Sequence, residues 1–333
     1  MLLDDILAQQ GAVSALRRAL QGQQLAQAYL FEGPGGVGKQ RTAMALACTA
    51  LCRQAEPGCG TCDSCKRVLS HNHPDVRVHS PRQEGNRNIQ VEVVRDEILP
   101  FTKFAPFESG PAFLIFPQAD VSFPEQHAQA ANALLKSLEE PRPGIHFILL
   151  AERPDRLLPT ILSRCQRLRF GPLPTGVIER ILAGQLLDEK IARLAAVLAS
   201  GRADRAMDLG QGDKALALTE LALRIDAMAE RAEPGPLLDL AAELSREEDL
   251  QLILETLASY YRDLAAISLG VAPALQWSFA ERTEGPFERR AAALGAGRAA
   301  ERVELVHRAA ESLERNANTE LAMDAMLFAL GSF

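Results

Sequence analysis

Several classes of protein are excluded by what this sequence has little of. Aromatic residues make up 5% of the chain and Trp277 is the single tryptophan, which argues against a surface that binds single strands by stacking bases. The 36 basic residues are outnumbered by 43 acidic ones, so we expect any contact with nucleic acid to be local or shared with partners. No run approaches the ~20 uncharged apolar residues of a membrane span. The opening residues MLLDDILAQQ carry two aspartates where a signal peptide has positive charge, so we expect a cytoplasmic protein without membrane contact.

What remains is the composition of a folded protein with more than one domain. Apolar residues make up 47% and charged residues 24%, which rules out wholesale disorder. At ~150 residues per domain, the length suffices for two or three domains. Residues 1–170 alternate short apolar runs with helical patterns, which predicts an α/β fold with a parallel sheet and crossover helices. The expected strands are Ala28–Gly33, Pro111–Phe116, His146–Ala151 and Arg167–Phe170.

The second half of the chain is predicted to be helical. The breaker cluster GPLP (Gly171–Pro174) follows the last expected strand and marks a boundary. Thr175–Leu209 has the pattern of a set of short helices, and Gly210–Gly212 forms a second joint. From Asp213 to Phe333 the apolar residues recur mostly at helical spacing. We therefore expect domains at residues 1–172, 173–212 and 213–333.

A glycine-rich segment, GPGGVGKQ (Gly33–Gln40), lies between an expected strand and an expected helix. In this context the G-x-x-x-x-G-K-[ST] pattern predicts a phosphate loop, because backbone amides can turn toward a phosphate while a lysine and the helix N-terminus add positive charge. The candidate phosphate-binding residues are Gly33, Gly35, Gly36, Gly38 and Lys39. The last position, whose hydroxyl would bind Mg²⁺, holds Gln40. The alternative is a glycine-rich turn with no relation to nucleotides.

The second element of a nucleotide-hydrolysing site is also altered. A working ATPase of this kind ends an apolar strand with acidic residues, of which one anchors Mg²⁺ and one polarises the attacking water. Here the strand runs into Pro117 and Gln118. Asp120 lies a few residues late, so we expect it to be a helix cap or a surface charge. With both elements altered, we predict no intrinsic ATPase activity and weak or absent binding of ATP or ADP.

Five of the six cysteines fall within eighteen residues, and four of them have the spacing of metal ligands. The candidate ligands are Cys52, Cys59, Cys62 and Cys65. Two successive C-x₂-C steps let thiolates converge on one ion, and four thiolates close its coordination, so we expect a structural zinc site with an iron–sulfur cluster as the alternative. Cys48 could replace Cys52, but we expect Cys48 to pack in the core. We expect ordinary loop histidines at positions His71, His73 and His79.

An arginine next to the last expected strand is the remaining candidate. Ser163, Arg164 and Cys165 lie at a helix end just before that strand. An arginine there is badly placed for a nucleotide of its own chain and well placed for that of a neighbour, where its planar fork can pair with γ-phosphate oxygens. The alternative is a surface arginine among several others in this stretch.

Taken as an ordered set, these motifs resemble one protein family. The segments that carry the resemblance are QAYLFEGPGGVGK (Gln27–Lys39), the four-cysteine insertion, HPD (His73–Asp75), NALLKSLEEP (Asn132–Pro141), LLPTILSRCQRL (Leu157–Leu168) and, more weakly, LERNANTELAMDAML (Leu313–Leu327). Together they are similar to the delta-prime family of bacterial DNA polymerase III clamp-loader subunits, within the AAA+ superfamily.

The resemblance implies an architecture and partners. It implies an AAA+ RecA-like domain over residues 1–172 with a zinc-binding insertion at 52–65, a helical lid over 173–212 and a helical collar over 213–333. It also implies a stator-like subunit in a ring with tau/gamma-type motor subunits and a delta subunit. Such a ring is a part of the polymerase III holoenzyme and loads the sliding clamp onto primer–template DNA in replication.

The resemblance also implies two residue roles. Arg164, with Ser163 and Cys165, would be an arginine finger offered in trans to a neighbouring ATPase subunit. In SGRADRAMDL (Ser200–Leu209), Arg205 is the candidate lid arginine directed at bound nucleotide, and a solvated helix charge is the alternative.

Two other functions remain open from sequence. An active ATPase of the tau/gamma or helicase-loader kind would have a Ser or Thr in place of Gln40 and acidic residues in place of Pro117 and Gln118. A zinc-containing nucleic-acid adaptor outside replication would bind DNA by itself in a salt-sensitive way, which the acidic composition disfavours.

Overall fold

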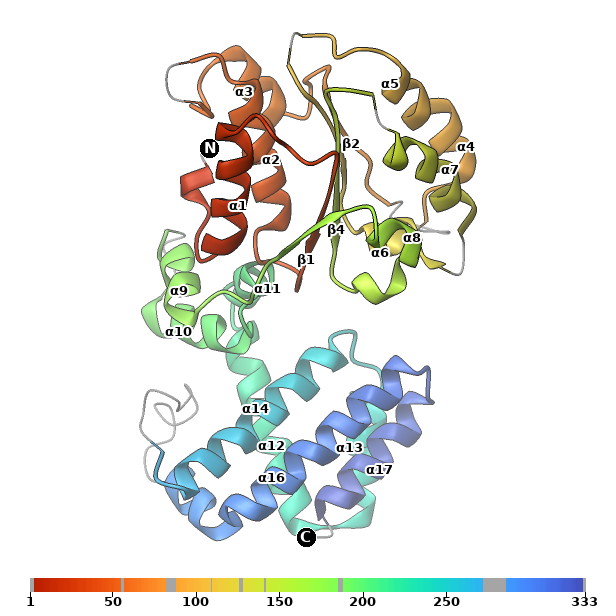
Figure 1. Cartoon of the computed structure of the whole chain (residues 1–333). Coiled ribbons are helices and arrows are strands. Elements are labelled where there is room, and N and C mark those ends of the chain that lie inside the picture. The colour runs from red at the N-terminus through yellow and green to blue at the C-terminus, as the bar shows by residue number, and fades with distance from the viewer. Residues whose placement is uncertain are drawn as a thin grey trace. The chain divides into compact units, whose positions relative to one another are not determined.

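The computed structural model describes most of the chain as two units (Figure 1). The described residues are 3–54, 57–81, 88–108, 110–125, 128–140, 142–184, 188–271 and 286–331. One unit comprises Met1–Ile178 with Gly201–Asp204, and the other comprises Glu179–Ser200 with Arg205–Phe333. The predicted domain boundaries at 172 and 212 stay predictions.

The first unit is built on a five-stranded parallel sheet of order β2-β3-β4-β1-β5. Its strands are β1 (Ala28–Glu32), β2 (Val76–Val78), β3 (Ala112–Phe116), β4 (Ile145–Ala151) and β5 (Gln166–Arg169). Every residue of β1, β3 and β4 is buried, as expected when helices cover both faces of a parallel sheet. The predicted α/β class is confirmed, and β2 is a strand that the sequence analysis missed.

Helices cover both faces of the sheet (Figure 1). One layer contains η1 (Leu3–Asp5), α1 (Gln10–Gln21), α2 (Lys39–Leu51) and α3 (Asp63–Leu69). The other contains α4 (Val91–Val93), the π-helical turn η2 (Val94–Ile98), α5 (Leu99–Lys103), α6 (Ala119–Ser122), α7 (Ala128–Glu139), η4 (Pro154–Arg156) and α8 (Pro159–Leu162). Because strand side chains alternate, Phe31 packs in the core with α2 while Leu30 packs in the core with α7.

The second unit is helical, as predicted. Its helices are the end of α9 (Thr175–Ala183), α10 (Glu189–Leu198), most of α11 (Ala203–Leu209), α12 (Lys214–Arg231), α13 (Pro234–Leu244), α14 (Leu250–Ser268), α16 (Pro286–Glu314) and α17 (Thr319–Gly331). Gly295 interrupts α16 with φ 74°, a backbone conformation that favours glycine. Among the described residues, no helix is both long and apolar enough to cross a bilayer.

A buried ionic network joins the helices of the second unit. Asp226 of α12 is 3% exposed and accepts hydrogen bonds from Arg302 Nη1 at 2.6 Å and Arg290 Nε at 2.6 Å, both from α16. The Tyr260 hydroxyl of α14 donates to the same carboxylate at 3.0 Å. Removing one partner of such a network lowers stability more than replacing the whole network with apolar groups, because a buried charge is left unpaired. We therefore expect the network to favour one pairing of α12, α14 and α16.

Three histidines, His73, His79 and His146, have pKa values lowered by burial and should make the stability of the first unit depend on pH. His146 in β4 donates Nδ1–H to the Ala26 carbonyl at 2.9 Å, and burial lowers its pKa below the ordinary 6.5. Burial also lowers the pKa of His79, whose ring stacks on Phe116. Since the unfolded chain takes up these protons more readily, their stabilising contribution is complete above pH 6.5 and is lost as the pH falls through that value toward the lower folded pKa.

We expect the free energy of unfolding, measured by urea titration, to fall between about pH 7 and about pH 5. The fall should be smaller in His146→Gln, which keeps a donor for Ala26 but does not titrate. His71→Gln is the matched control because His71 is exposed. Equal falls in His146→Gln and the parent protein would contradict this assignment.

Candidate functional site

The glycine-rich segment forms the predicted loop between a strand and a helix. β1 ends at Glu32, the loop follows, and α2 begins at Lys39. Gly36 and Gly38 have φ of 65° and 96°, values that favour glycine and turn the backbone sharply. Glu32 anchors the loop's base, because its buried carboxylate accepts hydrogen bonds from Arg167 Nε at 2.8 Å and Arg169 Nε at 3.0 Å of β5.

Lys39 lies inside the loop and not in solvent. Its side chain is 8% exposed, and Nζ donates to the carbonyl oxygens of Gly33 and Pro34 at 2.5 Å each. Burial lowers the Lys39 pKa, while the charges of Glu152 and Asp120 act in the opposite direction. The ammonium is therefore satisfied by its own chain.

The positions that should hold Mg²⁺ ligands offer none of the expected groups. Gln40 is exposed at the start of α2. After β3, Gln118 adopts a left-handed conformation with φ 53°, and α6 begins one residue later. Neither residue places a hydroxyl or a carboxylate beside the loop.

The predicted surface or capping role for Asp120 is wrong. Asp120 is 5% exposed in the first turn of α6, and its Oδ2 accepts a hydrogen bond from the Arg153 backbone N–H at 2.8 Å. Its Oδ1 is buried without a hydrogen-bond partner among the described residues. The left-handed turn at Gln118 produces this placement, because it folds the chain back toward the residues that follow β4.

The four candidate thiols converge, as their spacing predicts. Their Sγ atoms all lie within 4.8 Å of one another. Cys52 ends α2 and lies 3.7 Å from Cys59 and 3.9 Å from Cys62, which caps α3. Four sulfurs at about 2.3 Å from a tetrahedral zinc are about 3.8 Å apart, so the spacing fits that ion. Hydrogen bonds from Thr61 lower the pKa of Cys59 to about 6, which favours the thiolate a metal needs.

Among the described residues, the candidate metal-binding cluster contains only the four cysteines, and neither Cys48 nor His73 belongs to it. Cys48 is fully buried in the core between α2 and the sheet, and burial raises its pKa to about 11. His73 is also buried, but its Nε2 lies 3.2 Å from Ser64 Oγ and its Nδ1 accepts from the Asp75 backbone N–H at 3.1 Å. The packing role for Cys48 is confirmed. His73 lies in a loop, as expected, but it is buried and hydrogen-bonded there.

The HPD segment has a role that the sequence analysis did not assign. His73 contacts Ser64, which lies on α3 between two of the converging cysteines. The Asp75 carboxylate accepts hydrogen bonds from the backbone N–H groups of Phe107 at 2.6 Å and Glu108 at 2.8 Å. The segment therefore ties the four-thiol insertion and the loop before β3 to strand β2.

Arg164 lies between α8 and β5. Its Nη1 donates to the Thr160 carbonyl at 2.8 Å and to Ser163 Oγ at 3.2 Å, and its Nη2 pairs with Glu139 at the end of α7. β5 runs parallel to β1 with Gln166 beside Tyr29, so Arg164 precedes the amino end of the sheet while the phosphate loop follows the carboxyl end. Burial raises the pKa of the neighbouring Cys165 to about 12, so this thiol is neutral.

The segment 200–209, which contains the candidate lid arginine Arg205, contacts the phosphate loop through other residues. Arg205 pairs with Glu255 of α14. Arg202 and Asp204 instead lie against Gly35 and Gly36. The lid role of Arg205 stays a prediction.

Comparison with known proteins decides the family. Residues 8–174, half of the chain, match the family model described as DNA polymerase III, delta subunit. The chain is 38% identical over 201 residues to DNA polymerase III subunit delta′ of Bacillus subtilis, covering 60% of this chain and 58% of the relative. It is 37% identical over 179 residues to the delta′ subunit of Pseudomonas aeruginosa, covering 53% and 52%. This chain belongs to the delta-prime family of DNA polymerase III.

The match covers only part of each delta-prime relative. It spans little more than half the length of either delta-prime relative. The tau subunit of Bacillus subtilis is 33% identical over 178 residues, covering 53% of this chain and 30% of the relative. The family match at 8–174 contains the phosphate loop, the four thiols and Arg164, whereas Arg205 lies beyond it.

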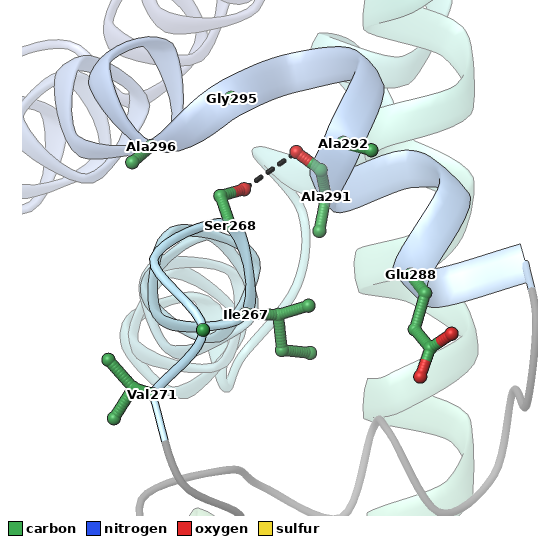
Figure 2. A pocket seen from close by; sticks show the side chains of 9 residues that line it. Ile267, Ser268, Val271, Glu288, Ala291, Ala292, Gly295 and Ala296 are labelled. Atoms are coloured by element: carbon green, nitrogen blue, oxygen red, sulfur yellow. Dashed lines mark hydrogen bonds between the residues drawn. The ribbon is translucent and has the colours of Figure 1, made fainter.

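A pocket in the second unit of this delta-prime chain contains none of these residues. It has a volume of about 550 Å³ and lies between the end of α14 and the first half of α16 (Figure 2). Its lining is mostly small, with Gly295 and Ala296 on one side, and Ser268 Oγ donates to the Ala291 carbonyl at 2.6 Å. Among the described residues of the lining, Glu288 is the single charged one, and these residues offer no set of converging catalytic groups.

Proposed function

We propose that this delta-prime chain is a non-hydrolysing, stator-like subunit of the polymerase III clamp loader. The observation that carries the proposal is the state of the phosphate loop: Lys39 Nζ is bound by the carbonyls of Gly33 and Pro34, and Gln40 replaces the Mg²⁺-binding hydroxyl. Without that hydroxyl, the loop would lack a usual ligand of Mg²⁺ and would not position a water against the γ-phosphate. The loop then serves as scaffold.

Within such a loader, Arg164 would act on the nucleotide of an adjacent motor subunit of the tau/gamma type. Its side chain is 31% exposed and lies at the opposite end of the sheet from its own phosphate loop, which supports a role in trans. A planar fork at this position can pair with γ-phosphate oxygens as their charge develops. Ser163 supports the turn, because its Oγ donates to the Thr160 carbonyl at 3.1 Å.

The remaining partners follow from the family. A delta subunit and the motor subunits would complete the ring, with residues 213–333 as the collar. The sliding clamp and primer–template DNA would be engaged by the assembled complex and not by this chain alone. The excess of 43 acidic over 36 basic residues supports binding of DNA by the assembled complex, because a chain that binds DNA alone usually needs a surplus of positive charge.

The four thiols would hold one structural zinc ion. Cys52, Cys59, Cys62 and Cys65 supply a full tetrahedral set, so the ion would have no open position for water. Its role would be to fix the insertion between α2 and α3. No catalytic step is assigned to it.

Hydrolysis assays test the proposal. The purified chain with Mg²⁺ and ATP should show no turnover above background, and it should co-purify with tau/gamma-type and delta subunits. Adding it to those subunits should raise their DNA-stimulated hydrolysis. Mg²⁺-dependent turnover by the chain alone that disappears in Lys39→Ala would instead favour an active ATPase of the tau/gamma or helicase-loader kind.

A further inference from the structure

We propose that Asp204 and Arg202 close the phosphate loop of this chain from within, so that a nucleotide phosphate must displace an internal carboxylate before it can bind. This inference deepens the proposed function, because it explains why a loop that keeps its glycines and lysine would be silent. It concerns binding and is independent of the missing Mg²⁺ ligands.

The backbone of residues 203–204 is seated directly on the loop. The Ala203 N–H donates to the Gly36 carbonyl at 3.1 Å. A Cβ placed on Gly36 would overlap Asp204 Oδ1 and would lie 2.8 Å from the Asp204 backbone nitrogen. Not even one carbon atom therefore fits between the Asp204 carboxylate and this part of the loop.

Arg202 closes the adjoining position. A Cβ placed on Gly35 would overlap Arg202 Nη2 and would lie 2.7 Å from Glu152 Oε1. Arg202 also pairs with Asp204 Oδ2 at 3.1 Å and with Glu152 Oε2 at 3.7 Å. The guanidinium thus holds two carboxylates at the mouth of the loop.

The positive charges at the phosphate loop already have carboxylates near them when no ligand is bound. Lys39 and Arg202 face three carboxylates, those of Asp120, Glu152 and Asp204, which all act on the Lys39 ammonium. A phosphate brought to the loop would be repelled by these carboxylates, two of which already pair with Arg202. Neutralising Asp204 removes the closest of these charges from Gly36 and frees part of the Arg202 fork for an anion.

Binding of ADP and of inorganic triphosphate, measured by calorimetry without Mg²⁺, tests the inference on the full chain. Asp204→Asn keeps the shape of the side chain and removes its charge. We expect its affinity for both probes to rise at least about tenfold over the parent protein. Adding Lys39→Ala should abolish the gain. Asp208→Asn is the matched control, because Asp208 lies on the same helix and its carboxylate pairs with Lys214.

Several outcomes would overturn the inference. Tight ADP binding by the parent protein would show that the loop is open. The inference also fails if Asp204→Asn and Asp204→Ala both keep the melting temperature of the parent protein but bind ADP and triphosphate no more tightly than Asp208→Asn does. That result would show that Asp204 does not close the loop. Neither result concerns hydrolysis, so a failure here is distinguishable from failure of the proposed function, which depends on turnover by the chain and on Arg164 in the loader.

Discussion

Arg164→Ala is expected to remove the stimulation that, on the proposed function, this chain would give to a neighbouring ATPase site. Arginines supplied in trans to a γ-phosphate contribute ~10³-fold or more to the rate of transfer. Since one motor site would face this chain, the effect is clearest in a loader whose other motor subunits carry a lysine-to-alanine change in their own phosphate loops. There, DNA-stimulated ATP hydrolysis should fall by about that factor, while assembly measured by gel filtration should not change.

The contacts of Arg164 within its own chain do not prevent this role. The Arg164–Glu139 pair is exposed, with side chains 31% and 46% accessible, and exposed pairs of this kind contribute about 0–1 kcal/mol. A γ-phosphate of a neighbouring subunit carries more charge and accepts both arms of the fork, so it can replace Glu139. The carbonyl of Thr160 can keep hold of Nη1 and orient the group.

Two variants separate the trans role from a general surface charge. Arg156→Ala removes another exposed arginine of the same stretch and should leave hydrolysis unchanged. Arg164→Lys keeps the charge but loses the planar fork, so we expect it to recover little of the activity. Unchanged hydrolysis and clamp loading in Arg164→Ala would contradict the assignment.

The sequence predicted the fold best where a strand is buried on both faces. β1, β3 and β4 were predicted because their mostly apolar runs, rich in Ile, Leu and Phe, have no solvent face to break them. β2 was missed because it has three residues with Arg77 at its centre, and its strand character comes from pairing with β3. Neither local pattern nor length identifies such an edge strand.

In the candidate sites, too, local sequence patterns were predictable and contacts that depend on the tertiary fold were not. The convergence of the four thiols was predictable because their spacing along 14 consecutive residues, 52–65, is typical of ligands to one ion. The contact of Arg202 and Asp204 with the phosphate loop was not, because the chain returns to Gly35 and Gly36 only after the whole sheet has formed. The burial of Asp120 likewise depends on a left-handed turn at Gln118 that no local motif indicates.

Loss of the four-thiol site is expected to unfold the insertion and leave the sheet intact. The purified chain should contain one zinc ion, measured by native mass spectrometry, and Cys59→Ser or Cys62→Ser should lose it. Zinc contributes ~10–16 kcal/mol to the folding of isolated zinc-finger peptides, and here we expect a smaller loss of roughly several kcal/mol. The reason is that Cys65 and Val68 hold α3 in the core even without the ion.

Hydrogen exchange can localise that loss. Amide protons of the residues around Cys59 and of α3 should exchange faster in Cys59→Ser, whereas those of β1 and β4 should keep their protection. Cys165→Ser is the matched control, because this thiol lies outside the cluster and should retain the ion. Iron with visible absorbance in place of zinc would identify an iron–sulfur cluster instead.

Acid should release the ion, because a metal thiolate competes with protons. Hydrogen bonds hold the pKa of Cys59 at about 6, so this sulfur remains a thiolate to lower pH than an ordinary cysteine. We therefore expect zinc to be retained at neutral pH and lost on acidification, with Thr61→Val shifting the release to higher pH. A chain that keeps the same protease resistance and hydrogen exchange with and without chelator would show that the four thiols do not stabilise the insertion through a metal.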